Sequence, residues 1–156
     1  MPLEIERKFL VLGEPWKTGA TGTPFVQGYL SNANGKTVRI RIAGERSFLT
    51  IKGPTSGFSR LEFEYPIPLE HARELFPLCE GALIEKTRFR LQHAAHLWEI
   101  DVFHAANDGL VVAEIELSDP AEPFVRPEWL GPEVSEDLRY SNVQLTRHPF
   151  RLWNGG

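Results

Sequence analysis

Charged residues recur at every second position in six segments of this chain, and most of the residues between them are apolar. The charged sets are Glu4-Glu6-Lys8, Arg39-Arg41, Glu62-Glu64, Lys86-Arg88-Arg90, Glu99-Asp101 and Glu114-Glu116, and Lys52 takes the matching position of a seventh segment. A period of two is typical of β-strands, in which residues i and i+2 share a face. One face of the predicted sheet is therefore charged and the other is apolar.

The alternation predicts eight strands separated by turn-forming residues. We expect them at about residues 3–12, 24–31, 37–43, 47–53, 59–67, 83–92, 97–103 and 110–118. Eight mostly antiparallel strands with short links and few helices favour an α+β fold: a closed, eight-stranded antiparallel β-barrel, or tunnel, with a few helices packed on its outside. Residues 1–156 would form one domain, with a core at about 3–145 and a C-terminal tail at 146–156.

Helix signals are fewer. Apolar residues at helical spacing predict one helix over 69–78, and a last helix is expected around 135–145. The proline-rich stretch 120–132 is predicted to be a loop with at most one short turn of helix. The end of the chain is expected to be loosely held, with Phe150 and Trp153 as the residues that pin it.

A lumen with this many charges cannot be a dry core, because burying unpaired charges costs too much. It must be wet, metal-bound or internally paired. The apolar face then points outward, and helices, the C-terminal segment or a second subunit must cover it. A homodimer is one arrangement that would do so.

Composition excludes several classes of function. A net charge of −4 argues against nonspecific nucleic-acid binding, and no apolar run approaches the ~20 residues of a membrane span. Cys79 is the only cysteine, which excludes an internal disulfide and a cysteine-based zinc site. The N-terminal residues lack the architecture of a secretory signal. We expect a cytoplasmic protein that binds neither nucleic acid nor membrane.

Both signs of charge on the lumen face have a chemical use. Carboxylates without nearby histidine or cysteine ligands favour Mg²⁺ or Mn²⁺ over zinc, and lysine and arginine suit phosphate oxygens. Either set alone also fits a solvated strand face. Together they suit metal-dependent phosphoryl transfer, in which cations hold a polyphosphate and metal ions neutralise the charge that develops.

The N-terminal Glu4-Ile5-Glu6-Arg7-Lys8 is an ExExK motif that resembles the signature of the CYTH superfamily, also called triphosphate tunnel metalloenzymes. The resemblance continues in order through Val38-Arg39-Ile40-Arg41, Thr50-Ile51-Lys52, Glu62-Phe63-Glu64, Lys86-Thr87-Arg88, Trp98-Glu99-Ile100-Asp101 and Ala113-Glu114-Ile115-Glu116-Leu117. It covers about residues 3–145. It implies an eight-stranded antiparallel tunnel and a divalent-metal-dependent enzyme that acts on small triphosphate-containing substrates.

Carried over residue by residue, the resemblance also implies roles. The metal ligands would be Glu4, Glu6 and Glu116, joined by Glu114 or Asp101, and the phosphate-binding residues would be Lys8, Arg39, Arg41, Lys52, Lys86 and Arg88. Glu62 and Glu64 would bind a second metal or orient the basic residues. Lys52 would act in catalysis with Glu4 and Glu6 by positioning the attacking water, and as a base only if its pKa were lowered. Arg90 and Glu99 share the lumen face without an assigned role, and Tyr29, Ser141 and Asn142 fit packing as well as substrate contact.

The small size of the chain favours hydrolysis of inorganic triphosphate to pyrophosphate and phosphate. A substrate that is all phosphate matches a lumen that is all charge, and no aromatic pocket for a nucleoside or thiamine is evident. The alternatives are an adenylate cyclase of class IV type, a thiamine or nucleoside triphosphatase with its substrate stacked on Trp16, Trp98 or Trp129, and a non-catalytic polyphosphate-binding module. The carboxylates argue against the module, because they repel phosphate unless they hold metal ions.

Overall fold

The computed structural model describes residues 3–153, and strands make up most of this part of the chain. The strands are β1 (Leu3–Val11), β2 (Gly22–Ala33), β3 (Lys36–Ala43), β4 (Arg46–Lys52), β5 (Ser59–Ile67), β6 (Glu80–His93), β7 (His96–Phe103), β8 (Val111–Glu116) and β9 (Leu130–Glu133). The α-helices are α1 (Leu69–Leu75) and α2 (Asn142–Arg147), and single 3-10 turns lie at Pro15–Lys17, Phe76–Leu78, Ala105–Asn107, Leu138–Tyr140 and Phe150–Leu152. All eight strands predicted from the alternation are present.

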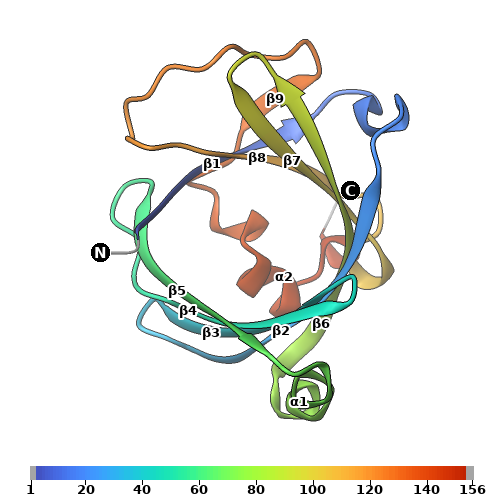
Figure 1. Ribbon diagram of the computed structural model, residues 1–156, viewed down its shortest axis with the longest axis vertical. Coiled ribbons are helices and arrows are strands. Elements are labelled where there is room, and N and C mark those ends of the chain that lie inside the picture. The colour runs from blue at the N-terminus through green and yellow to red at the C-terminus, as the bar shows by residue number, and fades with distance from the viewer. Residues whose placement is uncertain (1–2, 154–156) are drawn as a thin grey trace.

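The strands close into a ring (Figure 1). Antiparallel neighbours follow one another in the order β5-β4-β3-β2-β6-β7-β8-β1, and β1 returns to pair with β5. This closure uses only the start of β1, with Glu4 opposite Arg60. The eight-stranded antiparallel barrel predicted from the sequence is confirmed.

Tight turns join the strands where the sequence places its turn formers. Asn34 and Gly35, with φ of 54° and 79°, link β2 to β3, and Gly44, with φ of 62°, links β3 to β4. Two-residue hairpin turns require this left-handed backbone, which glycine and asparagine adopt most readily. Strands β3 and β4 thus form a tight hairpin, with Ala43 opposite Arg46.

The ninth strand corrects the prediction that residues 120–132 form only a loop. Leu130–Glu133 pairs with the end of β1, where Phe9 lies opposite Glu133. The prediction was wrong because Pro132 counts against a strand, whereas proline is tolerated in a short edge strand such as β9. The Arg7 guanidinium fixes the pairing through two hydrogen bonds to the Glu133 carboxylate, at 2.8 and 2.6 Å.

Over β1, β7 and β8 the apolar outer face is covered by the segment that connects β8 to β9. The rings of Phe124 and Trp129 in this segment lie edge-on to Trp98, with centroids 5.6 and 5.5 Å apart, and Trp98 also packs edge-on against Phe9. Trp98 and Phe9 are fully buried as a result. We expected helices, the C-terminal segment or a second subunit to provide this cover; over β1, β7 and β8 an extended connection provides it, and α1 packs against β3 and β4.

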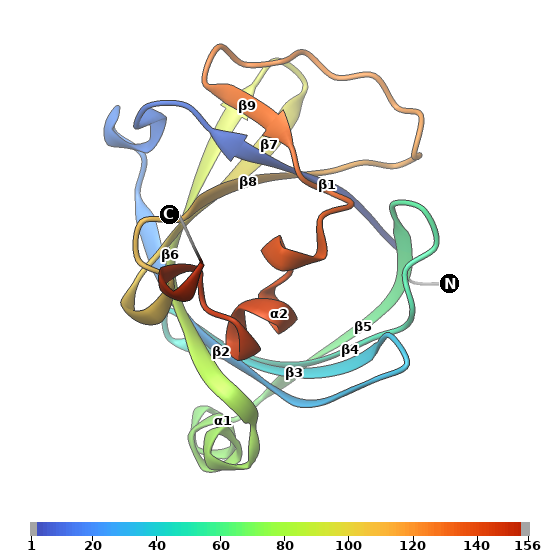
Figure 2. The same ribbon diagram turned by 180° about the vertical axis from the view of Figure 1, so that it is seen from behind.

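The inner face of the barrel changes from charged to apolar toward one end. The apolar cluster there combines Ile84, Phe103, Leu110 and Val112 from the barrel with Leu145 from α2. Ile84, Phe103 and Val112 continue the charged rows of their strands, so that Val112, for example, follows Glu116 and Glu114 along β8. In both views α2 lies inside the outline of the ring, whereas α1 lies outside it (Figures 1 and 2). Helix α2 therefore closes one end of the lumen. We had expected the helices to pack outside the barrel, as α1 does.

The last helix begins later than predicted, at Asn142. Ser141 is its N-cap, and its hydroxyl accepts a hydrogen bond from the Gln144 backbone at 3.1 Å. Asp137 instead caps the preceding 3-10 turn. The chain after the helix is held through residue 153, because Trp153 packs on Tyr140 and the Phe150 backbone donates to Asn107. The rest of the predicted tail, residues 154–156, lies outside the described residues. No helix within residues 3–153 is long and apolar enough to cross a membrane.

Candidate functional site

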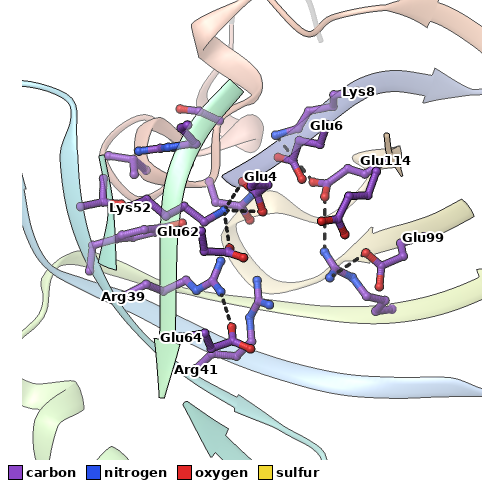
Figure 3. Close-up of a pocket in the computed structure, with 18 of the residues that line it drawn as sticks. Glu4, Glu6, Lys8, Arg39, Arg41, Lys52, Glu62, Glu64, Glu99 and Glu114 are labelled. Atoms are coloured by element: carbon purple, nitrogen blue, oxygen red, sulfur yellow. Dashed lines mark hydrogen bonds and ion pairs between the residues drawn. The ribbon is translucent and has the colours of Figure 1, made fainter. Parts of the chain in front are cut away.

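A cavity of about 280 Å³ occupies the charged part of the lumen. Its basic lining residues are Lys8, Arg39, Arg41, Lys52, Arg60, Lys86, Arg88 and Arg90, and its acidic ones are Glu4, Glu6, Glu62, Glu64, Glu99, Glu114 and Glu116. Of the site residues predicted from the sequence, only Asp101 does not line it. Figure 3 shows most of these side chains converging from separate strands.

The strand order separates the two signs of charge into two walls. The acidic wall consists of the seven lining glutamates, which come from the consecutive strands β7, β8, β1 and β5. The basic wall consists of Arg39, Arg41, Lys52, Lys86, Arg88 and Arg90, which come from β3, β4 and β6. Of the basic residues that line the cavity, Lys8 and Arg60 stand on strands of the acidic wall. A ligand in the lumen would therefore meet negative groups on one side and positive groups on the other.

The centre of the acidic wall has too little positive charge. The neighbouring lysines are engaged elsewhere, Lys8 with Glu114 at 3.8 Å and Lys52 with Glu4 at 2.8 Å, and Glu6 makes no ion pair within residues 3–153. Burial, with the charges of Glu114 and Glu4, raises the pKa of Glu6 to about 8. Glu116 lies directly opposite Glu6 across the β1–β8 pair. Its pKa is also raised, by burial and by the charge of Glu4.

This part of the wall fits a divalent cation by its chemistry. Within the described residues no three carboxylate, imidazole or thiolate groups converge as a set of metal ligands. Both carboxylate oxygens of Glu4 accept hydrogen bonds from Lys52, and Glu114 forms ion pairs with Lys8 and Arg88. Carboxylate oxygens are nevertheless the donors that Mg²⁺ and Mn²⁺ prefer. A cation beside Glu6 and Glu116 would offset the burial and the carboxylate repulsion that raise their pKa values.

Asp101 lies behind the basic wall and not with the other predicted metal ligands. It is 1% exposed, and its two oxygens accept hydrogen bonds from Lys86 at 2.7 Å and from Arg88 at 2.7 and 2.9 Å. Despite burial, these two cations hold the pKa of Asp101 well below its usual range. Its carboxylate is thus fully used in orienting Lys86 and Arg88 toward the lumen.

Lys52 is held as a cation. Burial opposes its charge, but Glu6 and Glu4 together raise its pKa above the usual value. Lys52 could act as a base only if its pKa were lowered, whereas the structure raises this pKa. Glu62 also pairs with Lys52, at 3.4 Å, and Glu64 pairs with Arg39, at 3.4 Å. Both carboxylates are therefore placed to orient basic residues, which is one of the two roles left open for them.

The basic wall has the complementary excess of positive charge. Burial, with Arg88 and Arg41 nearby, lowers the pKa of Lys86 to about 7. Burial, with Arg39 and Arg88, likewise lowers the pKa of Arg41. The ring of Phe25 lies among these groups, 4.8 Å from the Arg41 guanidinium carbon and 4.9 Å from that of Arg88. Crowded cations over an aromatic face are a favourable environment for an anion.

Several neutral lumen residues were not predicted. Phe25 and Gln27 lie on β2 in the same row as Tyr29, and Thr37 lies on β3 in the same row as Arg39 and Arg41. The Thr37 hydroxyl and the Arg39 Nε are buried without a hydrogen-bond partner among the described residues. The period of two could have found these positions, because it continues past the charges. It does not distinguish them from ordinary packing residues.

Comparison with known proteins gives a consistent result. The family model described as the CYTH domain matches residues 2–150. A protein of Acetivibrio thermocellus named inorganic triphosphatase is 44% identical over 152 residues, 97% of each chain, and one of Nitrosomonas europaea with the same name is 38% identical over 91% of this chain and 95% of its own. The crystal structure of the inorganic triphosphatase NE1496 has a TM-score of 0.67 at 34% identity, covering 97% of this chain and 99% of that one.

Proposed function

The chain belongs to the CYTH domain family, and on that premise we propose that it is a divalent-metal-dependent hydrolase that splits inorganic triphosphate into pyrophosphate and phosphate. The observation that carries the proposal is the division of the lumen into an acidic and a basic wall. One wall has too little positive charge and the other too little negative charge. A triphosphate and a divalent cation together would supply both.

The basic wall would bind the substrate. Arg39, Arg41, Lys86 and Arg88 present their donors to one cavity, as does Lys8 from the opposite side, and we assign Lys52 to the same set. Arginine binds phosphate oxygens bidentately, and the Arg39 Nε is a donor that has no acceptor within residues 3–153. Asp101 is proposed as a positioning residue for Lys86 and Arg88, a role that replaces the metal ligation expected from the sequence.

The acidic wall would hold the cation through Glu4, Glu6, Glu114 and Glu116. When bound there, a divalent cation neutralises charge on the phosphates and orients the attacking water. Glu6 and Glu116 are the ligands that need no release from an ion pair, whereas Glu4 and Glu114 would exchange a basic partner for the metal. Glu62 and Glu64 are proposed to orient Lys52 and Arg39.

Lys52 is proposed to act as a fixed positive charge next to the reacting phosphate. Because its amine stays protonated, it donates hydrogen bonds and stabilises charge that develops as water adds to the terminal phosphorus and the bond to the pyrophosphate oxygen breaks. Glu4 and Glu62 hold the amine in place from two strands.

The lining favours a purely inorganic substrate over a nucleoside or thiamine triphosphate. Tyr29 is the only aromatic residue that lines the cavity within the described part of the chain. Trp98 and Trp129 pack together on the outer face, and Trp16 lies beside Phe89 in the same apolar cluster. These tryptophans are therefore not placed to stack an organic group in the lumen. The choice between Mg²⁺ and Mn²⁺, a cytoplasmic location and a homodimer stay predictions.

Phosphorus NMR of tripolyphosphate mixed with the protein tests the proposal directly. With Mg²⁺ or Mn²⁺ we expect one orthophosphate and one pyrophosphate per substrate consumed, and no reaction with chelator. ATP and thiamine triphosphate, run in parallel, should react much more slowly. Cyclic AMP with released pyrophosphate from ATP would point to a cyclase instead, and binding of tripolyphosphate without any turnover would point to a binding module.

A further inference from the structure

We propose that Asn142 and Gln27 are positioning residues that hold Lys86 and Arg41 in the basic wall. Helix α2 would then do more than close the barrel, because its first residue would set the geometry of two phosphate-binding cations. This inference rests on the proposed function, in which Lys86 and Arg41 bind the substrate.

A continuous chain of hydrogen bonds connects these four residues. The Asn142 Oδ1 accepts from the Lys86 Nζ at 3.2 Å and from the Gln27 Nε2 at 3.3 Å. The Gln27 Oε1 in turn accepts from the Arg41 Nε at 2.7 Å. The chain therefore runs from β6 through α2 and β2 to β3, across the basic wall.

The chemistry of the four groups fixes the direction of every bond. The protonated Lys86 amine and the Arg41 guanidinium can only donate, so the amide oxygens of Asn142 and Gln27 face these two cations. That leaves the Gln27 amide nitrogen to donate to Asn142. Gln27 is fully buried and Lys86 is 1% exposed, so a lost bond in this chain would leave a polar group without water to replace its partner.

Neither amide is needed by the local structure that carries it. Ser141 already caps α2, and alanine at the first helical position would favour the helix more than asparagine does. The nearby closed end of the lumen is built from apolar side chains such as Leu145 and Ile84, which would pack well with an apolar residue. Two amides at this boundary are therefore better explained by the cations that they hold.

Neutral acceptors also suit the proposed chemistry better than carboxylates would. Asp101 already takes one hydrogen bond from Lys86 and cancels part of its charge. A second carboxylate in place of Asn142 would hold the amine equally well but would repel phosphate. An amide fixes the direction of the cation and leaves its charge for the substrate.

The test compares Asn142→Ala and Gln27→Met with Gln144→Ala. Gln144 lies on the same helix but lines a separate cavity with Leu138 and Trp153. For each folded variant we would measure the dissociation constant of tripolyphosphate by calorimetry in chelator and kcat/KM with Mg²⁺, both well below the melting temperature. We expect losses of about 10- to 100-fold in kcat/KM for the first two variants and no change for the control.

Two further variants separate positioning from a structural role. In the double variant Asn142→Ala with Gln27→Met, the loss should be smaller than the product of the two single losses, because the bond between the two amides couples them in one hydrogen-bonded chain. Asn142→Asp should keep kcat near the wild-type value and raise KM, since it retains the acceptor and adds a negative charge. The inference would be overturned if the two single losses in kcat/KM multiplied in the double variant, or if the single variants were as active as Gln144→Ala.

The same measurements distinguish failure of this inference from failure of the proposed function. A wild-type protein that binds tripolyphosphate without hydrolysing it overturns the proposed hydrolase, and the binding constants of the variants still decide the role of the two amides. A wild-type protein that neither binds nor hydrolyses it overturns both.

Discussion

Replacing Glu6 by glutamine should stabilise the metal-free protein in a way that grows with pH. Glu6 lies at the centre of the acidic wall, and burial with the charges of Glu114 and Glu4 raises its pKa from its ordinary 4.5 to about 8. The unfolded chain releases this proton near pH 4.5, whereas the folded chain keeps it until about pH 8. The contribution of Glu6 to stability is thus fully present below pH 4.5 and is lost as pH rises through 8.

The size of the effect follows from the same two values. Between pH 4.5 and 8, each pH unit costs the folded wild-type protein about 1.4 kcal/mol from this one group. Glu6 keeps some contact with the lumen, so we expect roughly half of the full amount, about 2 kcal/mol by pH 8. For a chain of this length that corresponds to a melting midpoint about 5 °C higher for Glu6→Gln than for wild type.

Thermal unfolding in chelator at pH 5, 6.5 and 8 measures this directly. Glu45→Gln, at the exposed turn between β3 and β4, is the matched control and should follow wild type at every pH. The pKa values of Asp101 and Glu114 are lowered, so both carboxylates stay ionised over this pH range and do not contribute to the difference. Adding Mg²⁺ at pH 8 should then raise the midpoint of wild type but not of Glu6→Gln. The reasoning would be refuted if wild type and Glu6→Gln had the same melting midpoint at pH 8, or if Mg²⁺ raised both midpoints equally.

Three other substitutions test separate parts of the site. Asp101→Asn removes the carboxylate that lies 2.7 Å from both the buried Lys86 and the buried Arg88, so urea unfolding should show a loss of about 3–5 kcal/mol, and an unchanged midpoint would contradict the role given to Asp101. Lys52→Met should lower kcat for tripolyphosphate by about 100-fold or more in steady-state kinetics, and a change confined to KM would argue against transition-state stabilisation. Thr37→Val removes a hydroxyl that has no partner among the described residues, so it should leave the melting temperature unchanged. It should weaken tripolyphosphate binding, measured by calorimetry, up to about 10-fold. A large loss of stability would show that the hydroxyl has a structural role.

The barrel could be predicted because each of its strands carries its own signal. Alternation of charged or polar with apolar residues fixes which face of every strand points inward, and a one-residue error would reverse the whole pattern. The exceptions have local causes. Strand β9 has only four residues and contains Pro132, and α2 begins at Asn142 because Ser141 acts as its cap.

The sequence predicted which charged residues face the lumen, but not how far along the barrel axis each of them lies. Glu99 and Asp101 have the same parity on β7 and look equivalent in the sequence. Asp101 lies one step closer to the apolar end, next to Phe103, and is enclosed by Lys86 and Arg88. Position along the barrel axis separates the two carboxylates, and no local pattern encodes it.

Neutral members of the site were missed for a related reason. Gln27 and Thr37 have the parity of the lumen face, but a single polar residue in a strand is most often an ordinary packing or surface position. Their significance depends on which cations lie beside them across the sheet. Gln27, for example, reaches Arg41 on β3 and Asn142 on α2, which is 115 residues further along the chain.

The separation of metal binding from phosphate binding is the central claim, and Mn²⁺ binding followed by electron paramagnetic resonance tests it most directly. Wild type, Glu6→Gln and Arg39→Ala would be titrated with Mn²⁺ without substrate. We predict that Glu6→Gln loses Mn²⁺ binding, whereas Arg39→Ala keeps it or binds more tightly because a nearby positive charge is gone. Unchanged binding by Glu6→Gln, or an equal loss in Arg39→Ala, would contradict the assignment of the two walls.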